Sequence, residues 1–91
     1  MNEIKELEFE LGRAIGLLVH ARLDEWAAKL EQIRKELAVD PRAAASSLVR
    51  LYGGIGSIND LILYRDGQPL IAENNELDRL RERMYDLSTS I

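Results

Sequence analysis

Apolar residues in this chain recur at the spacing of one face of an α-helix, and this pattern restricts the possible folds more than any other feature. Steps of three and four residues place side chains along one side of a helix. Three stretches follow these steps: Ile4, Leu7, Leu11, Ala14 and Leu18; Trp26, Leu30, Ile33 and Leu37; and Leu77, Leu80, Met84, Leu87 and Ile91. The pattern predicts an all-α protein.

The first predicted helix, Glu3–Arg22, carries a second apolar stripe, so we expect it to be the most buried helix. This stripe consists of Phe9, Gly12, Gly16, Val19 and Leu23. Each glycine costs about 1 kcal/mol of helix propensity relative to alanine. The cost favours a close approach of another backbone at Gly12 and Gly16.

Local signals predict where the other helices begin. Asp24 is a suitable N-cap for the second helix, because a short acidic side chain accepts hydrogen bonds from the first free N–H groups. Asp40 and the proline after it predict a third helix over about Pro41–Tyr52, because proline suits the first helical position. Its predicted inward residues are Ala44, Ala45, Leu48, Leu51 and Tyr52. Asn74 or Asn75 is expected to cap the last helix.

Between the third and last helices the helical pattern weakens, and we expect an irregular or hairpin-like excursion over about residues 54–72. Leu61 to Tyr64 is a short apolar run that fits a strand or a last helical turn. Asp66-Gly67 has the composition of a turn, and two short strands beside it would form a small hairpin packed on the helices. Residues 1–91 are therefore predicted to form a single helical domain, a compact four-helix bundle.

Composition disfavours several function classes. The 91 residues include no cysteine, which leaves no thiol nucleophile, disulfide or thiolate metal site. The net charge of −4 disfavours nucleic-acid binding. The N-terminus lacks the basic start of a secretory signal, and the longest apolar run, AIGLLVHA, is too short to span a membrane. We expect a cytoplasmic protein that binds neither nucleic acid nor membrane.

The stretch LYGGIGSINDLIL, Leu51 to Leu63, is the segment on which a function would depend. A structural interpretation accounts for its composition: Gly53 or Gly54 ends the third helix in a left-handed conformation, and Ser57 with Asp60 resembles a capping box. Asn59 is a further candidate to bond the loop backbone. The candidate segment comprises Tyr52, Gly53, Gly54, Ile55, Gly56, Ser57, Asn59 and Asp60.

The same segment also allows a functional interpretation. Its N–H groups are able to form a small anion-binding concavity. However, no lysine follows the glycines, and a helix rather than a strand precedes them, which disfavours a nucleotide site. If the segment has a binding function, we expect an exposed surface that recognises another protein. The residues expected in this surface are Tyr52, Ile55, Ile58 and Asn59.

Three stretches, DEWAAKLEQI, LVRLYGGIGSINDLIL and LDRLRERMYDLSTSI, resemble a group of small uncharacterised bacterial helical proteins. In that group a tryptophan-bearing helix precedes a Gly-Gly-Met-Gly-Ser-Leu/Phe-Asn-Asp-Leu segment and a final arginine-containing helix. The resemblance extends from about Leu23 to the C-terminus, with Ile55 where methionine is frequent. It implies a helical fold with this order of motifs, and it transfers no activity or cofactor.

Other candidate sites have simpler structural explanations. His20, the one histidine, lies near the end of the first helix, where it suits the helix dipole. Glu3 and Glu6 resemble half of a carboxylate pair that holds magnesium, but the second helix lacks the matching pair. The run RLRER at Arg79–Arg83 predicts a solvated, mutually paired face. In the alternative, Arg79 or Arg83 reaches back to Asp60 and holds the loop against the last helix.

These patterns favour a small cytoplasmic helical module that binds another protein. A homodimer and an immunity-like or antitoxin-like role are specific versions of this hypothesis, because the chain is small and acidic. The alternative is a small-ligand binder or enzyme that uses Ser57, Asn59 and Asp60, with His20 as a further candidate. We expect no enzymatic activity, no metal and no cofactor.

Overall fold

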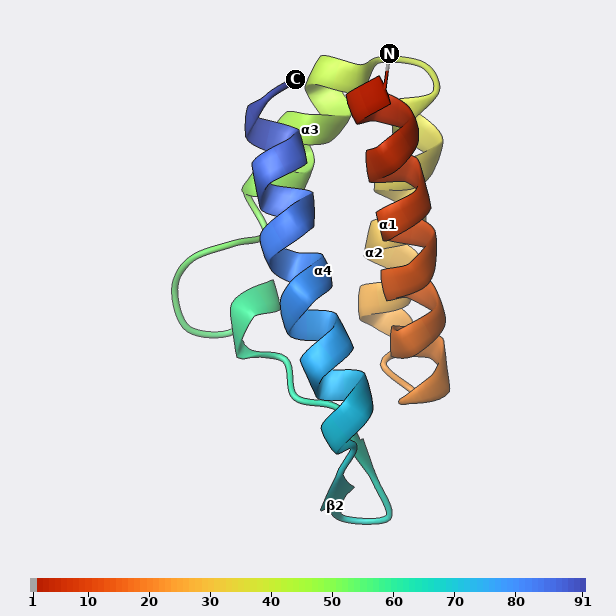
Figure 1. The fold of residues 1–91 in the computed structure, drawn as a ribbon, viewed down its shortest axis with the longest axis vertical. Coiled ribbons are helices and arrows are strands. Elements are labelled where there is room, and N and C mark those ends of the chain that lie inside the picture. The colour runs from red at the N-terminus through yellow and green to blue at the C-terminus, as the bar shows by residue number, and fades with distance from the viewer. Residues whose placement is uncertain (1) are drawn as a thin grey trace.

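The computed structural model describes residues 2–91 and contains four α-helices in that range (Figure 1). The elements, in chain order, are α1 (Asn2–His20), α2 (Asp24–Leu37), α3 (Pro41–Val49), the 3₁₀ turn η1 (Ile58–Asp60), β1 (Tyr64–Arg65), β2 (Gln68–Pro69) and α4 (Ile71–Thr89). The predicted all-α, four-helix fold is therefore confirmed, with an irregular segment and one small hairpin between α3 and α4.

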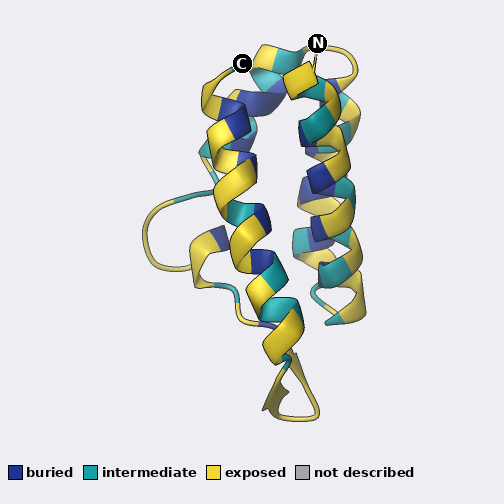
Figure 2. Cartoon of the chain, in the orientation of Figure 1, coloured by how far each residue is buried: buried dark blue, intermediate teal, exposed yellow. Residues whose placement is uncertain are grey.

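The helices enclose one cluster of buried apolar side chains. α1 packs against α2 and α4, and α3 packs against α2 and α4. Figure 2 shows that the buried positions of α1 and α4 alternate with exposed ones along each helix. The large side chains in this core are Leu7, Leu11, Leu18, Leu30, Leu37, Leu48, Ile58, Leu63, Leu77, Leu80 and Met84. The stripes predicted from the apolar spacing thus supply most of the core.

Three ion pairs connect α1 to α4 along their shared edge. Arg13 Nη2 lies 2.6 Å from Glu76 Oε2, Arg79 Nη1 lies 3.4 Å from Glu10 Oε2, and Arg83 Nη2 lies 2.6 Å from Glu6 Oε2. The residue numbers rise along α1 as they fall along α4, so the two helices are antiparallel. Both chain ends consequently lie at the same end of the molecule (Figure 1).

Most of the second apolar stripe is exposed, which contradicts the expectation that α1 is the most buried helix; of its members, Leu23 packs against the core. Phe9 is 62% exposed and Val19 is 54% exposed. A Cβ atom added at Gly16 would meet no atom within 4 Å, and one added at Gly12 would meet only Arg34 Nη1, at 3.9 Å. The prediction of a close backbone approach at these glycines is therefore wrong, because α2 and α4 cover a different side of α1.

Two helix boundaries also differ from the predictions. Asp24 is the first residue of α2 rather than its cap, and Leu23 at the N-cap position provides no side-chain bond. α3 ends at Val49 instead of about Tyr52, because the next N–H groups bond in tighter turns, such as Tyr52 N to Val49 O at 3.1 Å. The start of α3 is as predicted: Asp40 Oδ1 accepts a hydrogen bond from Ala43 N at 3.2 Å.

The hairpin expected around Asp66-Gly67 is present, but its four strand residues are exposed rather than packed on the helices as expected. β1 and β2 pair antiparallel, with Arg65 opposite Gln68. Asp66 and Gly67 have φ values of 52° and 80°, and two left-handed residues form the turn whose twist suits a two-residue hairpin.

Neither Asn74 nor Asn75 caps α4, which begins at Ile71 with Leu70 at the N-cap position. Instead, Asn74 Oδ1 accepts from Leu63 N at 2.8 Å, and Asn74 Nδ2 donates to Leu63 O at 3.0 Å. The asparagine thus joins the extended chain before the hairpin to the first turn of α4. Within residues 2–91, no helix combines the length and apolarity needed to cross a membrane.

Candidate functional site

The glycine segment, residues 52–60, follows α3 and contains three glycines in the left-handed backbone conformation. Gly53, Gly54 and Gly56 have φ values of 84°, 82° and 81°. A Cβ atom at any of them would meet no atom within 4 Å. Glycine is therefore required by the backbone conformation rather than by lack of space.

The polar side chains of the segment bond to its own backbone. Ser57 Oγ accepts from Asn59 N at 3.2 Å, and Asp60 Oδ2 accepts from Gly56 N at 2.6 Å. Asp60 therefore bonds one residue earlier than the predicted capping box requires, which would use the N–H of Ser57. Ile58 N donates to Leu51 O at 2.9 Å, and its side chain is fully buried.

The side chain of Arg81, in α4, forms hydrogen bonds with the backbone of the segment and of the residue after it. Its Nη1 donates to Ile58 O at 2.9 Å, to Leu61 O at 3.0 Å and to Asn59 O at 3.3 Å, and its Nη2 forms an ion pair with Asp78. The predicted contact of Arg79 or Arg83 with Asp60 is wrong. Those two arginines face α1, and the arginine between them on the helix faces the loop.

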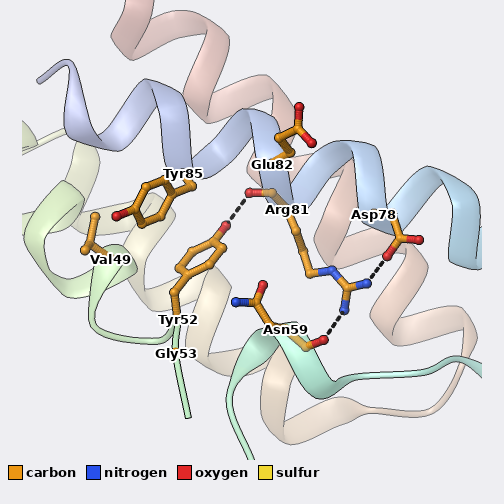
Figure 3. A pocket seen from close by; sticks show the side chains of 8 residues that line it. All are labelled: Val49, Tyr52, Gly53, Asn59, Asp78, Arg81, Glu82 and Tyr85. Atoms are coloured by element: carbon orange, nitrogen blue, oxygen red, sulfur yellow. Dashed lines mark hydrogen bonds and ion pairs between the residues drawn. The ribbon is translucent and has the colours of Figure 1, made fainter.

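A groove of about 750 Å³ lies between the glycine segment and α4 (Figure 3). Its lining residues are Val49, Tyr52, Gly53, Asn59, Asp78, Arg81, Glu82 and Tyr85. Tyr52 Oη donates to Arg81 O at 2.7 Å, and the ring centroids of Tyr52 and Tyr85 are 5.1 Å apart in an edge-to-face arrangement. Burial raises the pKa of the Tyr52 hydroxyl, so this group stays protonated and remains a hydrogen-bond donor.

Ile55 is fully exposed to solvent. Its neighbours in the chain are both left-handed glycines, Gly54 and Gly56. The predicted exposed surface is wrong for Ile58, which belongs to the core. Ile55 and Asn59 are exposed, Tyr52 is half-buried, and Tyr52 and Asn59 line the groove.

The groove does not assemble a catalytic group of the Ser-His type. Ser57 is buried and bonded within the loop. His20 lies at the end of α1, where Arg65 Nη2 donates to its carbonyl oxygen at 2.8 Å. The amide of Asn59 makes no side-chain hydrogen bond with the described residues, so it is open to an external partner.

Glu3 and Glu6, which were considered as metal ligands, are not among the residues that line the groove. Glu6 pairs with Arg83, and Glu3 is exposed in the first turn of α1. The described part of the chain brings together no group of three or more histidine or acidic side chains at metal-binding distances.

Sequence reasoning missed five residues of the groove: Val49 of α3 and Asp78, Arg81, Glu82 and Tyr85 of α4. One signal for them was present. Arg81 points away from Arg79 and Arg83 on a helix, so it belongs to a different face of α4. The sequence did not reveal that the loop packs against that face.

Comparison with known proteins gives one match. A family model described as a domain of unknown function (DUF6966) matches residues 19–71, which is more than half of the chain. The matched range contains α2, α3, the glycine segment and the hairpin. No curated protein and no solved structure matches the chain.

Proposed function

The chain belongs to the family described as a domain of unknown function (DUF6966), and we propose that it is a small cytoplasmic bacterial module that binds another protein. The docking surface consists of Ile55 and the adjoining groove. The partner is a different protein or a second copy of the chain. An immunity-like or antitoxin-like pairing with a basic protein is one version of this role.

The observation that carries the proposal is the full exposure of Ile55 on an anchored loop. Burying an isoleucine side chain against a partner contributes about 1.5–3 kcal/mol. The loop backbone is fixed by Asp60 at Gly56 N and by Arg81 at the carbonyls of Ile58 and Leu61. Because these bonds order the loop in advance, binding costs less conformational entropy.

The chemistry of the groove supports a protein as the occupant. Tyrosine side chains are common in protein interfaces because they combine a large apolar ring with a polar tip. Tyr85 is 41% exposed beside the half-buried Tyr52. Glu82 has no ion-pair partner among residues 2–91, and together with the net charge of −4 it favours a partner with basic side chains.

The alternative, a small-ligand binder or enzyme centred on Ser57, Asn59 and Asp60, has less support. Two of these three side chains already bond to the loop backbone. A ligand that recruited Ser57 or Asp60 would have to break a hydrogen bond that holds the loop. Asn59 alone is free to contribute.

The experiment that tests the proposal compares Ile55→Ser with Val39→Ser. Val39 is 85% exposed at the α2–α3 connection and provides a matched exposed aliphatic side chain away from the loop. Tagged wild type and both variants are expressed in the native host, crosslinked and purified, so that a bound partner is recovered with them. Light scattering of the purified proteins then measures their molar masses and reports whether a second copy is bound. We expect Ile55→Ser to lose a partner, or a second copy, that wild type and Val39→Ser retain. Equal recovery in all three proteins would contradict the proposal.

A further inference from the structure

A second recess lies beside the hairpin. Figure 1 shows the hairpin at the opposite end of the molecule from the labelled chain termini. The recess has a volume of about 590 Å³ and forms where the C-terminal end of α1 meets the hairpin. The residues that line it are His20, Ala21, Arg22, Tyr64, Arg65 and Asp66. None of them belongs to the groove beside the glycine segment.

Arg22 occupies a backbone conformation that glycine would adopt at lower cost. Its φ is 63°. Arg22 N donates to Val19 O at 3.0 Å and Leu23 N donates to Leu18 O at 2.8 Å, which is the bonding pattern of a helix end that normally carries a left-handed glycine. An observed outlier of this kind is a reason to look for a function of the side chain.

The Arg22 side chain is exposed and makes no hydrogen bond or ion pair with the described residues. No hydrogen bond or ion pair of this guanidinium with the described residues therefore offsets the cost of the left-handed backbone conformation. A ligand in the recess that Arg22 lines would supply that use.

Arg65 is held in place at the same recess. Its Nη2 donates to His20 O at 2.8 Å and lies 3.3 Å from His20 Nδ1. The remaining N–H groups of this guanidinium make no hydrogen bond with the residues that the structure describes. The neighbouring carbonyl groups of α1 already have partners, since those of Leu17, Leu18 and Val19 accept from Ala21 N, Leu23 N and Arg22 N.

The charges in the recess favour an anion. Arg22 and Arg65 carry two positive charges, and Asp66 is the one carboxylate among the described residues that line it. Neither arginine forms an ion pair with Asp66. Guanidinium groups bind phosphate oxygens with two parallel hydrogen bonds, and the volume is in the range of small-molecule sites.

We propose that this recess binds the phosphate group of a small ligand, with Arg22 and Arg65 as the direct contacts. Tyr64 and His20 supply further polar groups at its edge. This site is independent of the protein-binding surface proposed above, because the two surfaces share no residue. Arg22 accordingly trades fold stability for a ligand contact.

The test is a titration of ¹⁵N-labelled protein with sodium phosphate, and separately with ribose 5-phosphate, at an ionic strength held constant with sodium chloride. We expect saturable chemical-shift changes confined to the amides of residues 20–22 and 64–67. Shifts that do not saturate with either compound, or that saturate only elsewhere in the chain, would overturn the proposal.

Arg22→Gly separates ligand binding from folding. Because glycine fits the left-handed position, this variant should unfold at a higher denaturant concentration than wild type while its phosphate affinity falls roughly tenfold or more. Arg65→Gln should also weaken phosphate binding. Arg42→Gln removes the same charge from α3 and should leave affinity unchanged. An Arg22→Gly variant with wild-type affinity, or an equal loss in Arg42→Gln, would refute the assignment.

Discussion

At the scale of single residues, the sign of φ decides what a glycine does in this chain. Gly56 has a φ of 81° in the loop, whereas Gly16 lies inside α1 with helical geometry. Neither position is crowded, because an added Cβ would meet no atom within 4 Å at either one. The same substitution should therefore have opposite effects at the two positions.

We predict that Gly56→Ala destabilises the protein by about 1–2 kcal/mol, the cost of a left-handed conformation for a residue with a Cβ atom. Gly16→Ala should stabilise it by about 0.5–1 kcal/mol, because alanine restricts the unfolded chain and suits a helix. Denaturant unfolding of both variants measures the two changes. Destabilisation by Gly16→Ala would mean that the exposed face of α1 packs against a backbone after all.

At the scale of elements, α4 organises the irregular chain that precedes it. Residues between α3 and α4 have few regular backbone bonds, so side chains of α4 supply the missing partners. Arg81 bonds to three carbonyl oxygens of the loop, and Asn74 bonds to both backbone groups of Leu63. Tyr52 completes this arrangement from the loop side by donating to Arg81 O.

We predict that Arg81→Met destabilises the protein by roughly 2 kcal/mol or more, because it leaves loop carbonyls without a charged donor. The Arg81 side chain is only 13% exposed. Arg83→Met removes the same charge from the same helix, but it breaks an exposed pair with Glu6, which is worth less than about 1 kcal/mol. Hydrogen exchange should show faster exchange over residues 56–61 only in Arg81→Met. Equal effects of the two variants would refute the role of Arg81.

The elements also show which features the sequence was able to predict. Helix positions depend on local spacing, so the apolar stripes of α2 and α4 predicted their buried sides. The Asp66-Gly67 hairpin was likewise a local signal. By contrast, Asn74 was predicted as a helix cap and Arg79 as a partner of Asp60. Their actual partners, Leu63 and Glu10, depend on how distant segments pack. The groove was missed for the same reason, since α4 supplies half of it.

At the scale of the whole molecule, the arginines of α4 form ion pairs on two sides of the helix. Arg79 and Arg83 face α1, where they meet Glu10 and Glu6. Arg81 faces the loop. Glu82 lies on the outer side and lines the groove. The arginines of this helix therefore form ion pairs within the chain, whereas Glu82 has no ion-pair partner among residues 2–91.

The edge between α1 and α4 should make stability depend on pH. Hydrogen bonds from Arg79, together with the nearby Arg13, lower the pKa of Glu76 below its ordinary value of 4.5. Because the folded protein favours the charged carboxylate, the stabilisation is present above pH 4.5 and is lost as the pH falls through the lowered pKa. Glu76→Gln should therefore flatten the acid side of the stability profile, as measured by denaturant unfolding between neutral and acidic pH. Glu82→Gln, in the same helix but without an ion pair, should keep the wild-type slope. An unchanged slope in Glu76→Gln would show that this edge does not link folding to proton binding.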